Sequence, residues 1–96
     1  MELKLDGEGF LQDRGDWSVE VAKKIAQLDG TEIDEQQMTW ILEARQMYDD
    51  NGVVPPIRKF SKAMDVSTKD LYDSFTKGPM KLICKWGGLP KPTGCV

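Results

Sequence analysis

The sequence of 96 residues contains no histidine and only two cysteines, Cys84 and Cys95. A closed zinc site needs about four Cys or His ligands, so we expect neither a metal centre nor a resident cofactor. A Cys-x-x-Cys pair is also absent, which argues against a thioredoxin-like oxidoreductase. The two cysteines therefore stand out as the candidates for redox chemistry.

Long apolar runs are missing as well. None approaches the roughly 18 residues of a membrane-spanning helix. The N-terminus MELKLDGEGF lacks the basic stretch and apolar segment of a secretory signal. We therefore expect a cytoplasmic protein without membrane insertion. A cytosolic cysteine pair is normally kept reduced, which favours a transient bridge over a lasting one.

Charge is unevenly divided along the chain. Residues 1–57 hold five Lys/Arg against thirteen Asp/Glu, whereas residues 58–96 hold eight against three. A basic C-terminal half can meet an acidic partner, small anions or nucleic acid. A solvated surface with uneven charge is the alternative explanation.

Apolar spacing and capping residues predict a mainly α fold. Ser18, Asp34 and Ser67 stand at expected helix starts, and the last two form capping-box patterns with Gln37 and Asp70. Pro79 suits a first helical turn, and Gly87-Gly88 suits a helix end. The expected helices cover residues 18–29, 34–52, 55–64, 67–76 and 79–86.

The two ends of the chain have different patterns. Residues 3–11 read as two short strands around a glycine-bearing turn, which predicts a β-hairpin. The last ten residues, GGLPKPTGCV, hold three glycines and two prolines with almost nothing to bury. We call residues 87–96 the C-terminal arm and expect it to be mobile. The prediction is one domain over residues 1–96, in which residues 1–86 form the hairpin and a small orthogonal five-helix bundle.

The cysteines are placed for mutual contact. Cys84 lies in the expected fifth helix and Cys95 is the penultimate residue, with ten residues between them. Oxidation would close a loop between the two cysteines. In the chain-entropy model this cross-link stabilises the folded state by roughly 3 kcal/mol. Positive charge nearby would favour the reactive thiolate and attract anionic sulfur species. The candidates for this role are Arg58, Lys81, Lys85 and Lys91. The alternative is that Cys84 contributes only to core packing and that Cys95 has no chemical role.

A family resemblance rests on the C-terminal residues. The stretches GPMKLICK at 78–85 and GLPKPTGCV at 88–96 resemble the signature of the gamma-subunit family of dissimilatory sulfite reductase, the DsrC/TusE sulfur carriers. Weaker similarity runs through residues 6–17 and 51–62. The sequence departs from the family at residues 74–77, where relatives commonly read Leu-Phe-Pro, and at residues 86–88, where they read Ala-Gly.

The resemblance implies a sulfur carrier and co-substrate without independent turnover. Cys95 would carry the sulfur as a persulfide, Cys84 would resolve it as a trisulfide or disulfide, and Gly87-Gly88 would be the hinge of the arm. The implied partners are the catalytic subunits of dissimilatory sulfite reductase, a separate reductant and sulfur-relay proteins. Members that only relay sulfur toward tRNA thiolation usually lack the upstream cysteine, so Cys84 favours the dissimilatory branch.

Two alternatives remain open from the sequence. One is a sulfur relay for tRNA thiolation. The other is a helix-turn-helix DNA-binding regulator built from residues 57–76. The second helix of that pair carries Lys69 and Lys77 against Asp70 and Asp73. This neutral balance argues against DNA, because a phosphate footprint needs a basic face.

Overall fold

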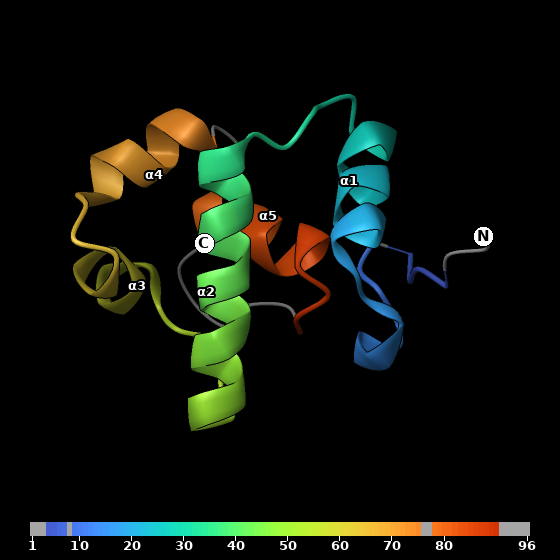
Figure 1. The fold of residues 1–96 in the computed structure, drawn as a ribbon, viewed down its shortest axis with the longest axis horizontal. Coiled ribbons are helices and arrows are strands. Elements are labelled where there is room, and N and C mark those ends of the chain that lie inside the picture. Colours follow the sequence, from blue (N-terminus) through green and yellow to red (C-terminus); the bar gives the residue numbers. More distant parts are fainter. Residues whose placement is uncertain (1–3, 8, 76–77, 91–96) are drawn as a thin grey trace.

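The computed structural model describes residues 4–7, 9–75 and 78–90, and in this part the predicted five α-helices are confirmed (Figure 1). A short 3-10 turn, η1, precedes them at Arg14–Asp16. The helices are α1 (Val19–Leu28), α2 (Glu35–Asn51), α3 (Ile57–Ala63), α4 (Thr68–Ser74) and α5 (Pro79–Trp86). None of the helices in the described ranges is long and apolar enough to span a membrane.

The predicted N-caps are confirmed. Ser18 Oγ accepts the backbone N–H of Val21 at 3.2 Å at the start of α1. Asp34 and Gln37 form the capping box of α2, and Ser67 and Asp70 form that of α4. Each side-chain acceptor satisfies a backbone donor that the first helical turn leaves without a partner. Local sequence therefore sets the start of these three helices.

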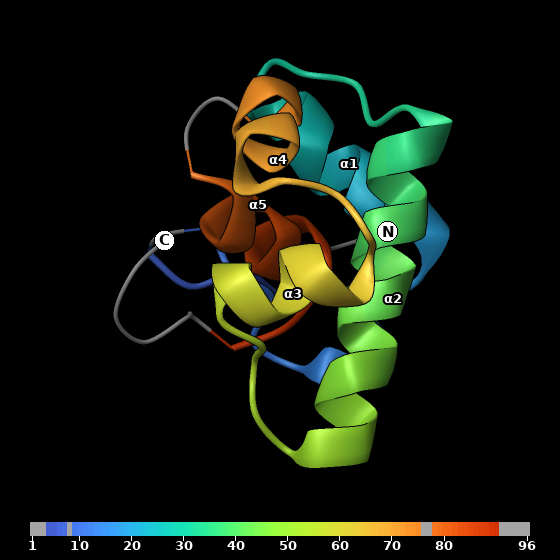
Figure 2. The ribbon, with the colours of Figure 1, turned by 90° about the vertical axis from the view of Figure 1, so that its left-hand side faces the viewer.

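Helix α5 is the element on which the others meet. It packs against α1, α2 and α4, and it crosses behind α2 in Figure 1. The turned view places α3 and α4 on one side of the molecule, joined by a short turn (Figure 2). Five of the eight residues of α5 are buried, so this helix contributes to the core along most of its length: Pro79, Met80, Ile83, Cys84 and Trp86.

The predicted N-terminal hairpin is only partly formed in the described residues. A single antiparallel bridge joins Leu5 and Leu11, and no longer strand is present within residues 4–7 and 9–12. Asp6 closes the turn, because its backbone N–H donates to Phe10 O and its side chain accepts the Phe10 N–H. Phe10 and Leu11 are buried against the helices. Packing of these side chains, not a strand ladder, fixes the segment.

The turn between α3 and α4 contains an unusual backbone conformation. Asp65 has a φ of 56°, which places a residue with a side chain in the left-handed region. Its N–H donates to Lys62 O at 3.2 Å, which helps to end α3. The two helices are packed together, as a helix-turn-helix arrangement requires.

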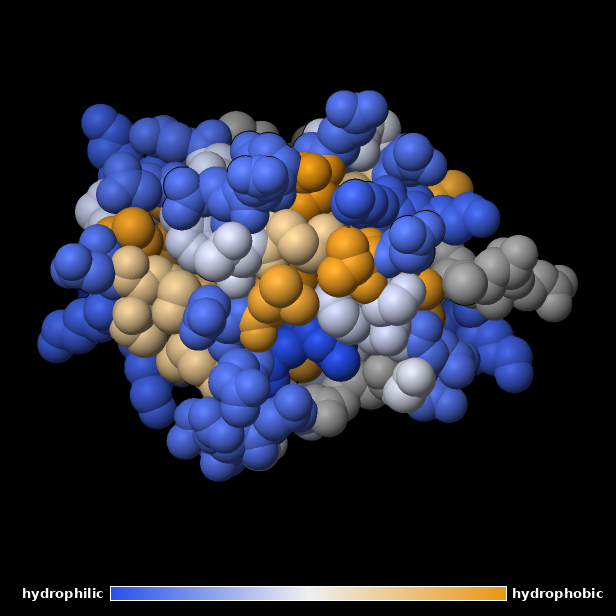
Figure 3. Space-filling view, in the orientation of Figure 1, coloured by the Kyte–Doolittle hydropathy of each residue, from blue (hydrophilic) through white to orange (hydrophobic). Residues whose placement is uncertain are grey.

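The surface has no dominant apolar patch on the face in Figure 3. Apolar side chains there form small areas separated by hydrophilic ones. The large apolar residues exposed in the described part come from several different elements, and scattered exposure of this kind is ordinary for a folded protein. They are Val19, Leu28, Leu42, Val53 and Tyr72.

Candidate functional site

Cys84 lies in the last turn and a half of α5 and is fully buried, with 0% of its surface exposed. Burial raises the pKa of the Cys84 thiol from 9.0 to about 12. The thiol is therefore protonated at neutral pH and is shielded from solvent. Because the thiolate is the nucleophile, Cys84 is unreactive in this conformation.

The chain that follows α5 turns back and bonds to the backbone of Cys84. The Leu89 N–H donates to Cys84 O at 2.9 Å, and the Gly87 N–H donates to Ile83 O at 2.8 Å. Gly88 has a left-handed φ of +66°. The 6→1 bond onto Cys84, with a left-handed glycine between, has the geometry of a Schellman motif. Leu89 is only 1% exposed, so the cap also brings an apolar side chain into the core.

Two side chains from distant parts of the chain hold this turn. Trp17 Nε1 donates to Trp86 O at 2.8 Å, and Arg45 Nη1 donates to Gly87 O at 2.5 Å. The Arg45 Cζ lies 3.9 Å from the centroid of the Trp17 ring, within the range of a cation–π contact. We call Trp17 and Arg45 together the clamp. It joins the segment before α1, the middle of α2 and the end of α5.

The predicted hinge residues lie inside this packing. Gly87 and Gly88 are both buried. A Cβ on Gly88 would lie 2.8 Å from Cδ1 of Trp17, and a Cβ on Gly87 would lie 2.5 Å from Ile83 O. Both positions therefore need glycine for close approach, and Gly88 needs it also for its backbone angle. Movement at Gly88 must first break its packing against Trp17.

Among the predicted cationic residues that the structure describes, Arg58 lies apart from Lys81 and Lys85. Lys85 Nζ pairs with Asp29 Oδ1 at 2.8 Å, so its charge is compensated. Lys81 is exposed on α5, whereas Arg58 is exposed on α3 and lines a separate shallow hollow with other basic residues. Lys91 and Cys95 lie outside the described residues.

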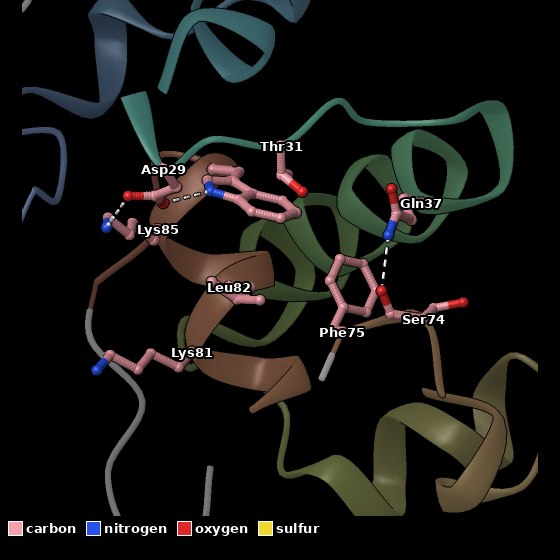
Figure 4. Close-up of a pocket in the computed structure, with 9 residues that line it drawn as sticks. Asp29, Thr31, Gln37, Ser74, Phe75, Lys81, Leu82 and Lys85 are labelled. Atoms are coloured by element: carbon pink, nitrogen blue, oxygen red, sulfur yellow. Dashed lines mark hydrogen bonds and ion pairs between the residues drawn. The ribbon is translucent and has the colours of Figure 1, made fainter. Parts of the chain in front are cut away.

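A cleft of about 280 Å³ opens beside α5 (Figure 4). Its lining includes Lys81, Leu82, Lys85 and Trp86, and Cys84 is not part of it. The polar groups in the cleft mostly bond to one another: Gln37 donates to Ser74 O at 2.8 Å, and Asp29 accepts from Lys85 and Trp86. Helix α5 thus shows one face to this cleft and buries Cys84 elsewhere.

Sequence reasoning missed the clamp and the burial of Leu89. Neither Trp17 nor Arg45 is among the candidate residues that the sequence singles out. Arg45 is the one basic residue of α2, and it directly follows the buried Ala44. A lone cation beside the buried face of an acidic helix was the available signal for a structural role.

Comparison with known proteins covers the full chain. Residues 1–96 match the family described as DsrC like protein. The gamma subunit of a dissimilatory-type sulfite reductase from Nitratidesulfovibrio vulgaris is 36% identical, over 98% of this chain and 90% of that protein. The sulfurtransferase TusE of Escherichia coli is 32% identical, over 99% of this chain and 94% of that protein.

Solved structures agree with the fold. The NMR structure of DsrC from Allochromatium vinosum has a TM-score of 0.89 at 35% identity, and covers 100% of this chain and 92% of its own. The crystal structure of the oxidized gamma subunit from Archaeoglobus fulgidus has a TM-score of 0.84 at 35% identity, and covers 100% of this chain and 94% of its own.

Proposed function

This chain belongs to the DsrC-like protein family, and from that membership we propose that it is a sulfur carrier that presents Cys95 to a larger enzyme of dissimilatory sulfur metabolism. The proposed partner is the catalytic part of a dissimilatory sulfite reductase, because a relative at 36% identity is named as the gamma subunit of that enzyme. Each cycle would consume the protein as a co-substrate and would need a separate reductant to restore it.

The observation that best supports this proposal is the position of Cys84. Its thiol is buried in α5, and its carbonyl oxygen accepts the N–H of Leu89, six residues before Cys95. Six residues span at most about 20 Å when extended, so a Cys95 thiol has the reach to enter a partner and to return. Cys95 itself lies outside the described residues, and the mobility of the arm is part of the proposal.

The proposed chemistry balances without an added oxidant. Cys95 takes up a partly reduced sulfur as an S–S–OH group with loss of water. The Cys84 thiol then attacks the outer sulfur, an S–S bond forms, the S–O bond breaks, and the thiol proton leaves with the hydroxyl as water. The product is a Cys84–Cys95 trisulfide. A reductant supplies four electrons and four protons, which release sulfide and restore both thiols.

A persulfide cargo gives a shorter route on the same residues. Attack of Cys84 on the Cys95 sulfur of a Cys95 persulfide releases sulfide and leaves a disulfide, which two electrons reduce. The TusE relatives, named sulfurtransferases, support a second candidate function, in which the cargo is passed to a further relay protein and on to tRNA. In that case Cys95 is loaded by a protein persulfide and not by a sulfite reductase.

Intact mass spectrometry tests the carrier function. The reduced protein is incubated with a dissimilatory sulfite reductase that turns over sulfite, and separately with a cysteine desulfurase and its substrate. We expect the sulfite reductase to produce a species that has gained one sulfur and lost two hydrogens. Gain of sulfur only with the desulfurase would favour the tRNA-directed relay, and no gain with either would contradict a carrier role.

Two matched variants separate the roles of the cysteines. Cys95→Ser removes the proposed carrier thiol and is expected to acquire no sulfur. Cys84→Ser leaves the carrier thiol and is expected to hold sulfur on Cys95 without forming the bridged product. Equal behaviour of both variants and the wild type would contradict the assignment of these residues.

A further inference from the structure

We propose that Trp17 and Arg45, the clamp, form a gate over Cys84 that must open before this thiol can react. The inference rests on the proposed function and assigns it two positioning residues. Neither side chain would touch the sulfur cargo. They would act by holding residues 87–89 over the resolving cysteine until the arm is pulled away.

The covering segment is short and is fixed at each residue. Gly87 donates to Ile83 O and accepts from Arg45, and Leu89 donates to Cys84 O. Gly88 lies against the Trp17 ring in a left-handed conformation. In a Schellman motif the residue at the position of Leu89 commonly packs against the residue at the position of Cys84. The same backbone turn that ends α5 therefore brings Leu89 onto the backbone of Cys84, and both residues belong to one buried cluster.

The two members of the clamp bond to successive carbonyls. Trp17 donates to the carbonyl of Trp86, and Arg45 donates to the carbonyl of Gly87. These carbonyls belong to the end of α5, where the helix itself supplies no donor. Arg45 is half-buried on the Trp17 ring, so its bond is charge-assisted and partly shielded from water. Loss of either donor leaves a carbonyl at the helix end without that partner.

The gate sets the order of steps in the proposed sulfur cycle: sulfur uptake by Cys95 precedes attack by Cys84. While residues 87–89 cover Cys84, its thiol cannot attack the sulfur carried on Cys95, so the bridged product forms only after the gate opens. Residues 90–96 follow the clamped segment in the sequence, and under the proposed function they reach a partner while the gate is closed. Opening then exposes Cys84, frees three further residues of chain, and allows the two cysteines to meet.

Thiol labelling tests the gate without any sulfur-metabolising partner. In a Cys95→Ser background Cys84 is the only thiol. Its rate of reaction with iodoacetamide is measured under native conditions at low urea. We expect the slope of log rate against urea to be smaller than the slope for global unfolding, because opening is local. A slope equal to the global one would overturn the proposal.

Variants of the clamp give the second test. Trp17→Phe removes the N–H donor and keeps a ring, and Arg45→Met removes the guanidinium and keeps an apolar stem. We expect labelling of Cys84 to become about 10-fold faster in the first and roughly 10- to 100-fold faster in the second. Arg45→Lys keeps a donor and a charge and should restore part of the protection.

The matched control is Ser67→Ala, which removes the N-cap of α4 and does not touch the clamp. We expect this variant to lose global stability with little change in labelling at low urea. The gate proposal is wrong if Ser67→Ala accelerates labelling as much as the clamp variants do. It is also wrong if the clamp variants are labelled at the rate of their parent. Either failure would leave the carrier function intact, since sulfur uptake by Cys95 is measured separately.

Discussion

Asp29 and Trp86 are joined by a hydrogen bond of 2.9 Å from the indole Nε1 to the carboxylate Oδ2, while Oδ1 of the same group pairs with Lys85. Asp29 is the C-cap of α1, so its carboxylate ties the end of that helix to the last turn of α5. The charge of Lys85 is therefore engaged in holding α5 in place. It is not free to lower the pKa of a thiol in this conformation.

Substitutions of Asp29 should separate the contribution of its hydrogen bond with Trp86 from that of its ion pair with Lys85. Asp29→Asn keeps an oxygen for Trp86 and loses only a partly exposed ion pair, so we expect a loss of about 0–1 kcal/mol. Asp29→Ala leaves the buried indole N–H without this acceptor and should cost about 1–3 kcal/mol in the free energy of unfolding. Urea denaturation measures both, and equal losses would mean that the Trp86 bond contributes little.

Close packing at Gly88 predicts a large cost for an added methyl group. Gly88→Ala would strain a left-handed backbone and place Cβ 2.8 Å from Trp17. Gly52 is the matched control, because it has a φ of 75° and no atom lies within 4 Å of an added Cβ. We expect Gly52→Ala to cost about 1 kcal/mol, and Gly88→Ala to cost at least about 1 kcal/mol more. Similar losses in urea denaturation would contradict the packing of Gly88 on Trp17.

Burial of Cys84 makes stability depend on pH in the alkaline range. The thiol pKa is about 12 in the folded protein and 9.0 when the thiol is exposed. The unfolded state loses the proton first, so the stabilising contribution is complete below pH 9 and is lost as pH rises toward 12. The loss should be about 1.4 kcal/mol per pH unit within that window.

A cysteine-free variant isolates this effect from other titrating groups. Free energies of unfolding are compared for Cys95→Ser and for Cys95→Ser with Cys84→Ala, at about pH 8 and about pH 10.5. We expect the stability advantage of the Cys84-containing protein to shrink by about 2 kcal/mol between the two pH values. An unchanged difference would show that the Cys84 thiol is not shielded in the folded state.

The left-handed Asp65 predicts a stabilising substitution. Its φ of 56° costs a residue with a side chain more than it costs glycine. Asp65→Gly removes this strain but raises the entropy of the unfolded chain, so we expect a net gain of up to about 1 kcal/mol. Thermal denaturation should show a higher Tm. A lower Tm would mean that the Asp65 side chain contributes more than its backbone strain costs.

Helix boundaries could be predicted because their causes are local. Ser18, Asp34 and Ser67 each accept a backbone donor within three residues, and this pattern is visible in the sequence. The predicted β-hairpin is only partly formed, because the conformation of this segment depends on contacts with distant residues. Within residues 4–7 and 9–12 the segment forms one bridge, and Phe10 and Leu11 are held by packing against distant helices.

The candidate site could be predicted only in part. The cysteine spacing and the C-terminal motif singled out Cys84, and the structure places it in the last part of α5. The clamp could not be predicted, because Trp17 and its acceptor Trp86 are 69 residues apart. The composition of residues 87–96 predicts almost no burial, yet Leu89 is buried where α5 ends in a left-handed glycine.

The most direct test of sulfur carriage is a non-reducing peptide map of the wild-type protein, taken after turnover with sulfite and a dissimilatory sulfite reductase. The proposal predicts one cross-linked product that contains the Cys84 and Cys95 peptides with one additional sulfur atom between them. Unmodified peptides would contradict the proposal, and so would additional sulfur on the Cys84 peptide without a cross-link to the Cys95 peptide.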